Sequence, residues 1–468
     1  MSAPVPTGPA QASAPVGPDP HERGFSTRIG FVLAAVGSAV GLGNVWRFPY
    51  FAATYGGGTF LVTYLVVIAV FGLMMMIAEI TIGRATGLGP LGAFRTLHRR
   101  FAFLGVIAAL TPMVIFPFYS VIGGWVTRYA WTFLTGGAAD AAQAGHFGAF
   151  TSQTWQPILW LGVFVAVNAA LLLVGVRKGI ERVNVIAMPA FIVMVLALVV
   201  YGLTLDGALA GLDYFLRPDF SQLSLNTVVA ATRQTFFSLS LSAGVMLTYG
   251  SYLRKDASIE RSAMQAAALD TTVSLLAGLL VIPAVVAFMG YEGLGQGAGL
   301  LFITLPQVFA SMPGGAFVGA VFFALMFVAA VTSGISLMEV PVATVMEKTR
   351  LKRRGAVLVV AAGTVLLALP TTLGFGVWSE FTIGGMNVLG QMSFLTDVIM
   401  MPLVGLGTAI LVGWVLGPKV IAAVVRQNGH RFRTERLFSV TMRWIAPVVL
   451  VLVLTTSLLM ALGVIPPL

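Results

Sequence analysis

Long runs of apolar residues, separated by short polar segments, dominate this chain of 468 residues. About 20 apolar residues allow a helix to cross the hydrocarbon core of a bilayer. The predicted spans lie near residues 28–53, 58–83, 103–135, 155–175, 183–205, 225–252, 262–290, 313–346, 355–375, 387–416 and 440–463. We therefore expect an all-α integral membrane protein with about eleven transmembrane helices.

The composition supports a membrane protein and narrows its chemistry. The chain is 58% hydrophobic and 9% charged, whereas soluble proteins carry about 25% charged residues. Its net charge of +10 does not indicate a nucleic-acid partner, because the basic residues lie in short loops between the spans. The absence of cysteine excludes disulfides and thiolate chemistry, and the four histidines show no ligand spacing.

The distribution of positive charge predicts the orientation. Basic residues cluster in alternate loops, and the loops at 136–154, 206–224, 291–312 and 376–386 contain one basic residue, Arg217. Because basic loops stay in the cytoplasm, we expect a multi-pass protein of the cell inner (plasma) membrane. Its N-terminus would be cytoplasmic and its C-terminus outside. Residues 1–22 are rich in Pro, Ala, Gly and Ser and are predicted to be a disordered tail.

Two predicted spans contain residues that disfavour a regular helix at mid-membrane. Span one carries Gly37, Gly41, Gly43 and Asn44, and span six carries the segment 238–244, SLSLSAG. An opened backbone in a bilayer is tolerated only where protein or a cavity satisfies it. Two interrupted helices five spans apart are typical of an inverted-repeat transporter with its site between the breaks. The alternative is that Ser and Gly only allow close helix packing.

The residues around these interruptions resemble a known family. The stretches at 37–49 (GSAVGLGNVWRFP), 234–240 (QTFFSLS) and 332–334 (TSG) are similar to motifs of the neurotransmitter:sodium symporters, in their bacterial amino-acid branch. The resemblance implies sodium-coupled symport of an amino acid by alternating access. It also implies one transporter domain, 23–463, in which helices 1 and 6 are unwound at mid-membrane. Its parts would be a first five-helix repeat (28–205), a second inverted repeat (225–416) and an eleventh helix (440–463).

The resemblance implies two sodium sites built from oxygen atoms. The first would use Ala39, Asn44, Ser238 and Asp270, together with the carboxylate of the substrate. The second would use Gly37, Val40, Ala329, Thr332 and Ser333. The alternative for each hydroxyl is a hydrogen bond to its own helix.

The resemblance also implies an amino-acid site at the helix break. Monoamine members carry an acid at the position of Gly41, so its absence here favours a substrate that brings its own carboxylate. Ala243 stands where leucine-type relatives have a bulky aromatic residue, which favours a large hydrophobic or aromatic amino acid. The implied substrate-binding residues are Ser38, Ala39, Leu42, Gly43, Ile115, Tyr119, Phe237, Ser238, Ser240, Ser242, Ala243, Ser333 and Leu337.

Asp270 bears on chloride. Many animal members bind chloride with groups that match Tyr64, Gln234, Ser238 and Ser274, and Asp270 places a carboxylate beside that location. An acid inside a membrane is costly and indicates a functional site. We expect Na⁺ to be the partner of Asp270 and expect two sodium ions in all. We expect transport not to require chloride. Exchange of a proton on Asp270 stays open.

Two gates follow from the resemblance. The outer gate would use Arg47 and Phe237. The family's acidic partner for the arginine falls at Ser393, so either Asp397 one turn away pairs with Arg47 or water bridges it. The inner gate would use Arg23, Phe25, Ser251, Tyr252 and Glu347. Arg23 is equally consistent with a topology signal. Glu79 is expected against the backbone of span six.

Other classes of function receive less support. A receptor or sensor of the same fold would usually need a signalling domain. An ion channel would use symmetric pore-lining segments. An enzyme would need a catalytic constellation inside the membrane, and the sequence shows none with suitable spacing. We therefore expect a transporter and not an enzyme.

Overall fold

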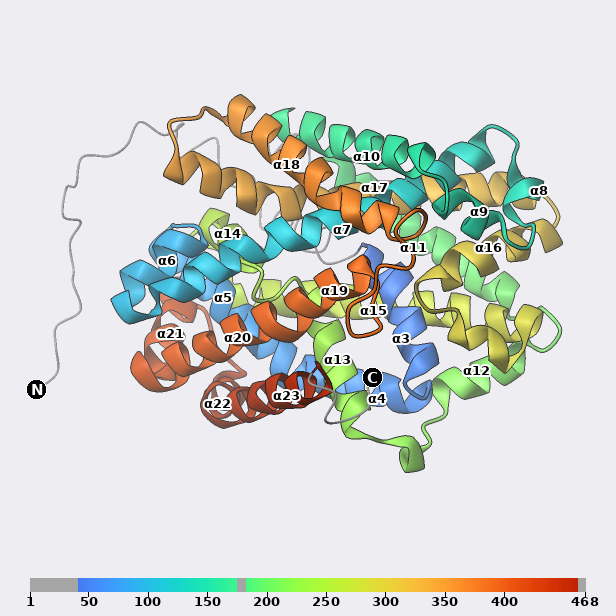
Figure 1. Cartoon of the computed structure of the whole chain (residues 1–468). Coiled ribbons are helices and arrows are strands. Elements are labelled where there is room, and N and C mark those ends of the chain that lie inside the picture. Colours follow the sequence, from blue (N-terminus) through green and yellow to red (C-terminus); the bar gives the residue numbers. More distant parts are fainter. Residues whose placement is uncertain (1–40, 175–181, 462–468) are drawn as a thin grey trace, which may run out of the picture.

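The fold is known from a computed structural model that describes residues 41–174 and 182–461 (Figure 1). Within these residues the structure is helical, and the β contact recorded there is an isolated bridge between Ile383 and Met386. The helices of the predicted spans are, in chain order, η1 (Gly43–Arg47) with α3 (Phe48–Thr54), α4 (Gly58–Val67) with η2 (Ile68–Gly72) and α5 (Leu73–Thr86), α7 (Ala102–Leu134), α10 (Trp155–Val174), α11 (Arg182–Gly202), α13 (Leu225–Ser238) with α14 (Val245–Tyr252), α15 (Ile259–Met289), α17 (Gly315–Lys348), α18 (Arg353–Leu373), α19 (Val388–Phe394) with η7 (Leu395–Met400), α20 (Met401–Ile410) and η8 (Leu411–Val415), and α22 (Glu435–Val440) with η10 (Thr441–Ile445) and α23 (Ala446–Ala461). The predicted all-α membrane fold is confirmed.

Shorter helices connect these spans. They are α6 (Pro90–Leu97), η3 (Arg99–Phe101), α8 (Ala138–Ala141), α9 (His146–Thr151), α12 (Ala208–Leu216), η5 (Phe220–Gln222), η6 (Tyr291–Gly299), α16 (Leu300–Ser311), α21 (Pro418–Val425) and η9 (Gln427–Gly429). In Figure 1 the spans run side by side, and α8, α9, α12 and α16 gather at one end of the bundle.

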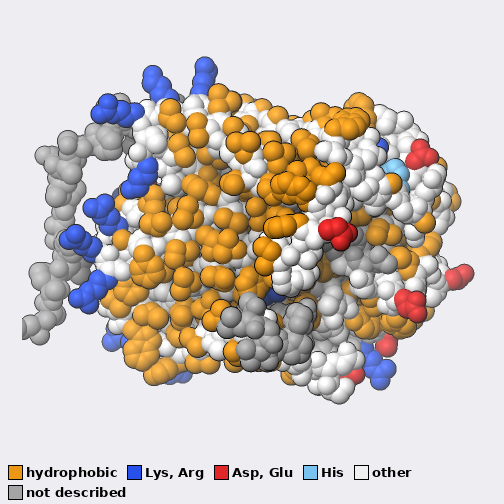
Figure 2. Space-filling view, viewed as in Figure 1, with side chains coloured by type: hydrophobic (Ala, Val, Ile, Leu, Met, Phe, Trp, Pro, Cys, Tyr) orange, Lys and Arg blue, Asp and Glu red, His pale blue; other side chains and the backbone are white. Residues whose placement is uncertain are grey.

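Eight continuous helical segments in the described residues are long and apolar enough to cross a membrane. The remaining spans do not meet that criterion, because span six is interrupted and only parts of spans one and five are described. Figure 2 shows hydrophobic side chains over the middle of the visible face, with Lys and Arg at its left end and Asp and Glu at its right. The membrane therefore surrounds the middle of the bundle.

The interruption of span six is a real break in the helix. α13 ends at Ser238, and α14 begins at Val245. Between them Ser240 and Ser242 adopt positive φ angles of 52° and 60°, which are uncommon for residues other than glycine and mark strained, often functional, backbone.

Glu79 in α5 stabilises this break. Its Oε1 accepts a hydrogen bond of 2.7 Å from the Ser242 backbone N–H, and the Ser242 hydroxyl donates to the same oxygen. A buried N–H without an acceptor would cost about 1–3 kcal/mol. The predicted position of Glu79 against the span-six backbone is confirmed.

Close packing holds α5 beside α14. A Cβ atom on Gly83 would collide with the Leu247 carbonyl, and one on Gly250 would collide with the Ile80 carbonyl. Small residues let membrane helices approach this closely. The broken helix is thereby fixed against a continuous one, which positions the polar groups described next.

Candidate functional site

A buried polar cluster joins span one to spans six and seven. The Asn44 side-chain amide donates to Asp270 Oδ1 at 2.6 Å and to Ser238 Oγ at 3.2 Å. Ser238 Oγ in turn donates to Asp270 Oδ2 at 2.6 Å. All three side chains are fully buried. The structure therefore brings together three of the four residues expected at the first sodium site.

The oxygen-rich character of this cluster suits an alkali cation. A hydroxyl and a carboxylate are hard ligands, whereas Asn44 Oδ1 accepts a hydrogen bond of 3.0 Å from the Gly41 backbone N–H. Within residues 41–174 and 182–461, no group of three or more His, Cys, Asp or Glu residues could hold a metal ion.

Groups compared above with a chloride site surround the same carboxylate. Ser274 Oγ accepts from the Asn44 amide at 2.8 Å, and the Tyr64 hydroxyl lies 3.5 Å from both Asp270 Oδ2 and Ser274 Oγ. Gln234 Nε2 donates to the Gly43 carbonyl at 2.9 Å. Asp270 thus places a fixed negative charge among these groups.

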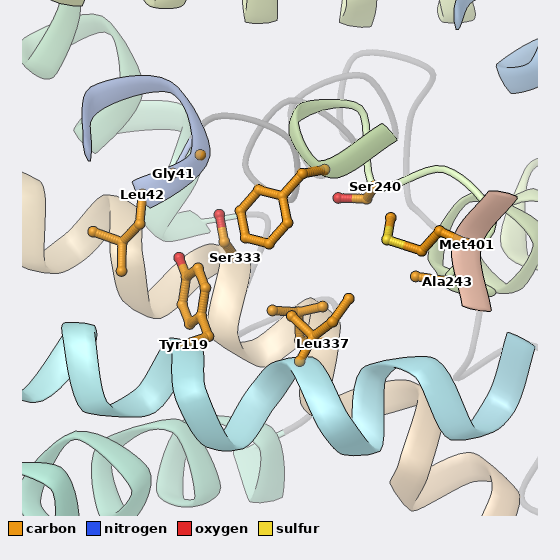
Figure 3. Close-up of a pocket in the computed structure, with 11 residues that line it drawn as sticks. Gly41, Leu42, Tyr119, Ser240, Ala243, Ser333, Leu337 and Met401 are labelled. Carbon is orange, nitrogen blue, oxygen red and sulfur yellow. The ribbon is translucent and has the colours of Figure 1, made fainter. Parts of the chain in front are cut away.

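A pocket opens beside this cluster, between the start of the described part of span one, the break in span six and helices α7, α17 and α20 (Figure 3). In Figure 3, Leu42, Tyr119 and Ser333 lie at one end of the pocket, and Ser240, Ala243 and Met401 lie at the other. The lining residues are Gly41, Leu42, Gly43, Ile115, Tyr119, Phe237, Ser240, Ala243, Ser333, Leu337 and Met401. Apart from Gly41 and Met401, each was a sequence-predicted substrate residue.

The end of the pocket at Gly41 has no room for a side chain. A Cβ atom there would overlap Ser333 Oγ and would lie 3.1 Å from the Tyr119 hydroxyl. That hydroxyl donates to the Ala330 carbonyl at 3.1 Å. Only glycine therefore allows span one to pack this closely against Ser333 and Tyr119.

Two predicted pocket residues lie elsewhere. Ser238 belongs to the Asp270 cluster, and Ser242 points to Glu79 instead of lining the pocket. Met401 lines the pocket but was missed, because it lies on the far helix α20 and nothing in its local sequence marks a site. The positive φ angles of Ser240 and Ser242 interrupt the regular helical path, which explains why these serines face different partners.

The region of the expected second sodium site is described only in part. Thr332 and Ser333 are buried on α17, and the Thr332 hydroxyl donates to the Ala329 carbonyl at 3.0 Å. This is the hydrogen bond to its own helix that was the stated alternative. Four expected ligands or pocket residues, Gly37, Ser38, Ala39 and Val40, lie outside the described residues.

Above the pocket, Arg47 pairs with Asp397. The Arg47 guanidinium donates to Asp397 Oδ2 at 2.6 Å, and the two side chains are 2% and 0% exposed. The guanidinium carbon also lies 4.4 Å from the centroid of the Phe237 ring, within cation–π range. The residues expected at the outer gate are therefore in contact.

Ser393 supports this pair instead of leaving Arg47 to water. Its hydroxyl donates to Asp397 Oδ2 at 2.7 Å. Arg47 ends the π-helical segment η1, and Asp397 lies in the π-helical segment η7. Of the two alternatives, the direct pairing of Arg47 with Asp397 is the one that the structure shows.

In the C-terminal half of α17 the structure shows a buried acid, Glu339, that sequence reasoning missed. Glu339 is buried and pairs with Arg353 at 2.8 Å, and the Tyr252 hydroxyl donates to Glu339 at 3.4 Å. Tyr252 was expected instead beside Glu347, which is exposed. Glu339 could have been found as an intramembrane acid. The expected partners of Glu347, Arg23 and Phe25, lie outside the described residues, and the Ser251 hydroxyl donates to the Thr248 carbonyl at 2.6 Å.

Comparisons with known proteins agree with this geometry. The family described as "Sodium:neurotransmitter symporter family" matches residues 22–142 and 144–463. The sodium-dependent transporter YhdH of Bacillus subtilis is 35% identical over 383 residues, 81% of this chain and 84% of that protein. A sodium-dependent transporter of Haemophilus influenzae is 31% identical, over 84% of this chain and 89% of that protein. The crystal structure of MhsT in complex with L-phenylalanine superposes with a TM-score of 0.88 at 36% identity, over 93% of this chain and 99% of that chain.

Proposed function

The chain belongs to the sodium:neurotransmitter symporter family, and we propose that it imports a hydrophobic or aromatic amino acid with sodium by alternating access. Members of this family are sodium-dependent transporters of the membrane and not enzymes, so the chain is a multi-pass sodium-dependent transporter. The proposal concerns the substrate, the ions and the gates.

The observation that carries the proposal is the pocket beside the buried Asn44–Asp270 cluster. At Gly41 the Ser333 and Tyr119 hydroxyls lie close to the backbone of span one, and these polar groups could bind the carboxylate of an amino acid. Ala243 and Met401 line the other end with apolar surface, which suits a large apolar side chain. The solved relative MhsT holds L-phenylalanine, which supports the same class of substrate.

We propose two sodium ions as co-substrates. One would bind among Ala39, Asn44, Ser238 and Asp270, and the other near Ala329, Thr332 and Ser333 with the carbonyls of Gly37 and Val40. A carboxylate already lies beside Tyr64 and Ser274. A second anion there would be repelled, so transport would not need chloride.

The two ends of the path would close in turn. Arg47, Phe237 and Asp397 would form the outer gate, and Glu347 with Arg23, Phe25 and Ser251 the inner one, whereas Tyr252 contacts Glu339. We place the protein in the cell inner (plasma) membrane with a cytoplasmic N-terminus. The repeats at 28–205 and 225–416 would move against each other within the one domain, 23–463.

Uptake into proteoliposomes tests this function. Purified protein is reconstituted, a sodium gradient is imposed, and uptake of each of the twenty amino acids is measured with chloride or gluconate as the anion. We expect sodium-dependent uptake of Phe, Tyr, Trp, Leu or Met at equal rates in both anions. Uptake confined to Gly and Ala would contradict the substrate class, and dependence on chloride would contradict the role of Asp270.

A further inference from the structure

A second pocket lies far from the transport path, at the outer ends of α7 and α10. Its volume is about 360 Å³. The lining residues are Arg128, Trp131, Thr132, Thr135, Gly137, Asp140, His146, Trp155, Gln156, Leu159 and Trp160. They come from α7, the α8 and α9 segments and α10, at the end of the bundle where Figure 1 shows α8 and α9. This end lies opposite the concentration of Lys and Arg in Figure 2.

Arg128 gives the pocket a cation that forms no ion pair among the described residues, although Asp140 lines the same pocket. It lies in the membrane-spanning helix α7, six residues before the helix ends at Leu134. Its guanidinium donates to Thr132 of the same helix and lies 5.9 Å from the Phe150 ring centroid. Among the ion pairs formed by residues 41–174 and 182–461, none includes Arg128. A cation at this depth normally faces an anion, so an external anion fits it.

The tryptophans place this pocket at the surface of the membrane. Trp131 and Trp155 are 55% and 64% exposed, and the Trp131 and Trp160 rings lie 6.1 Å apart. Tryptophan is enriched where the hydrocarbon meets the headgroups. Exposed Leu134 and Leu159 continue the apolar surface beside the rings. A ligand with an anionic head and apolar chains matches this arrangement.

Asp140 adds the opposite charge to the same pocket. Its carboxylate accepts a hydrogen bond from Gln143 at 3.2 Å and is exposed. A ligand that carries both a phosphate and an ammonium group would find a partner for each. Phosphate binds guanidinium through charge-assisted hydrogen bonds, and a primary ammonium donates to a carboxylate.

We propose that this pocket binds the headgroup of an ethanolamine phospholipid, with the phosphate at Arg128 and the ammonium at Asp140. The acyl chains would lie along the exposed leucines of α7 and α10. The site rests on the membrane-spanning fold and not on the identity of the transported substrate, so the uptake assay and the lipid assay can fail separately.

Lipid binding to the purified full-length protein tests the proposal. Native mass spectrometry counts bound dioleoyl phosphatidylethanolamine and dioleoyl phosphatidylglycerol at matched concentrations. Arg128→Gln should weaken phosphatidylethanolamine binding about tenfold or more. Asp140→Asn, at an exposed position that folding does not need, should remove the preference for phosphatidylethanolamine over phosphatidylglycerol. Arg217→Gln is the control: it removes one positive charge from the exposed ion pair with Asp213 at the end of α12. It should leave lipid binding unchanged.

Two further arms locate and identify the ligand. Phosphatidylethanolamine brominated on its acyl chains should quench tryptophan fluorescence, and Trp131→Phe with Trp155→Phe should remove most of that quenching. Free phosphoethanolamine, which lacks acyl chains, should not displace the lipid. The proposal is overturned if both Arg128→Gln and Asp140→Asn bind the two lipids as the parent does. It is equally overturned if free phosphoethanolamine competes as well as the lipid.

Discussion

The two polar regions of this molecule differ in where their charged groups find partners. In the interior, Arg47 and Asp397 pair with each other, and Asp270 is held by Asn44 and Ser238. In the second pocket, called the rim pocket below, Arg128 forms no ion pair with a carboxylate of the described residues. This pocket opens beside exposed tryptophans. A buried charge must be compensated inside the protein, whereas a charge at the membrane surface can bind a lipid. Burial therefore separates groups that couple to one another from groups available to an external ligand.

The largest expected effect is at Asp270 in the interior. Asp270→Asn removes the charge that Asn44 and Ser238 contact, and contacts of a buried charged group are each worth about 1.5–3 kcal/mol. We expect sodium affinity to fall roughly 100-fold or more, measured by sodium titration of amino-acid binding. Asp256→Asn is the matched control, since that carboxylate pairs with Arg254 in an exposed loop. Equal sodium affinity in the two variants would remove Asp270 from the ion site.

The next effect is at the buried Arg47–Asp397 pair. Asp397→Asn leaves an uncompensated guanidinium and should lower the free energy of unfolding by about 3–5 kcal/mol, with loss of uptake. Ser393→Ala removes one hydrogen bond to Asp397 and should cost about 0.5–1.5 kcal/mol. Thermal unfolding in detergent measures both. If Ser393→Ala lowered the free energy of unfolding more than Asp397→Asn, Asp397 would not be the main partner of Arg47.

These two interior sites also show what the sequence could predict. The spans and the broken sixth helix follow from the pattern of apolar and small residues, and the Asn44–Ser238–Asp270 group follows from the family resemblance. Asp397 was harder, because the position at which the family resemblance implies an acid is occupied by Ser393, four residues earlier. Met401 and Glu339 were missed because their roles depend on which helices become neighbours.

The rim pocket was invisible to sequence reasoning for a related physical reason. Arg128 stands alone in an apolar span, and its surroundings are built from three segments that meet only in the fold. A signal was present in Trp131, Trp155 and Trp160, which flank the ends of two adjacent spans. Such tryptophans predict an interface belt, but they do not by themselves predict a pocket.

A third, intermediate effect concerns the rim. In detergent without added lipid, Arg128→Gln should unfold at a temperature close to that of the parent, because no internal ion pair is lost. Added phosphatidylethanolamine should stabilise the parent more than the variant, since a ligand stabilises the state it binds by RT ln(1 + [L]/Kd). A tenfold weaker affinity corresponds to about 1.4 kcal/mol less stabilisation at saturating lipid. If added lipid raised the unfolding temperature of both proteins equally, Arg128 would not bind the lipid.

The smallest effect is a pH dependence at His146 in the rim pocket. Burial lowers the pKa of His146, the Arg128 charge lowers it further, and Asp140 opposes them. The imidazole is therefore neutral at pH 7 and takes up a proton only below its ordinary range. A bound phosphate would raise that pKa, so linkage requires phosphate binding to strengthen as the pH falls.

The interaction involves partly exposed groups and is worth up to about 1 kcal/mol. Phosphatidylglycerol affinity should therefore rise by at most about fivefold between pH 7.5 and pH 5, and His146→Gln should abolish the rise. Sodium affinity at the interior site should not change with this substitution, because His146 lies in the outer pocket and contacts Tyr129 there. A His146→Gln variant whose sodium affinity changed as much as its lipid affinity would show that the two regions are coupled.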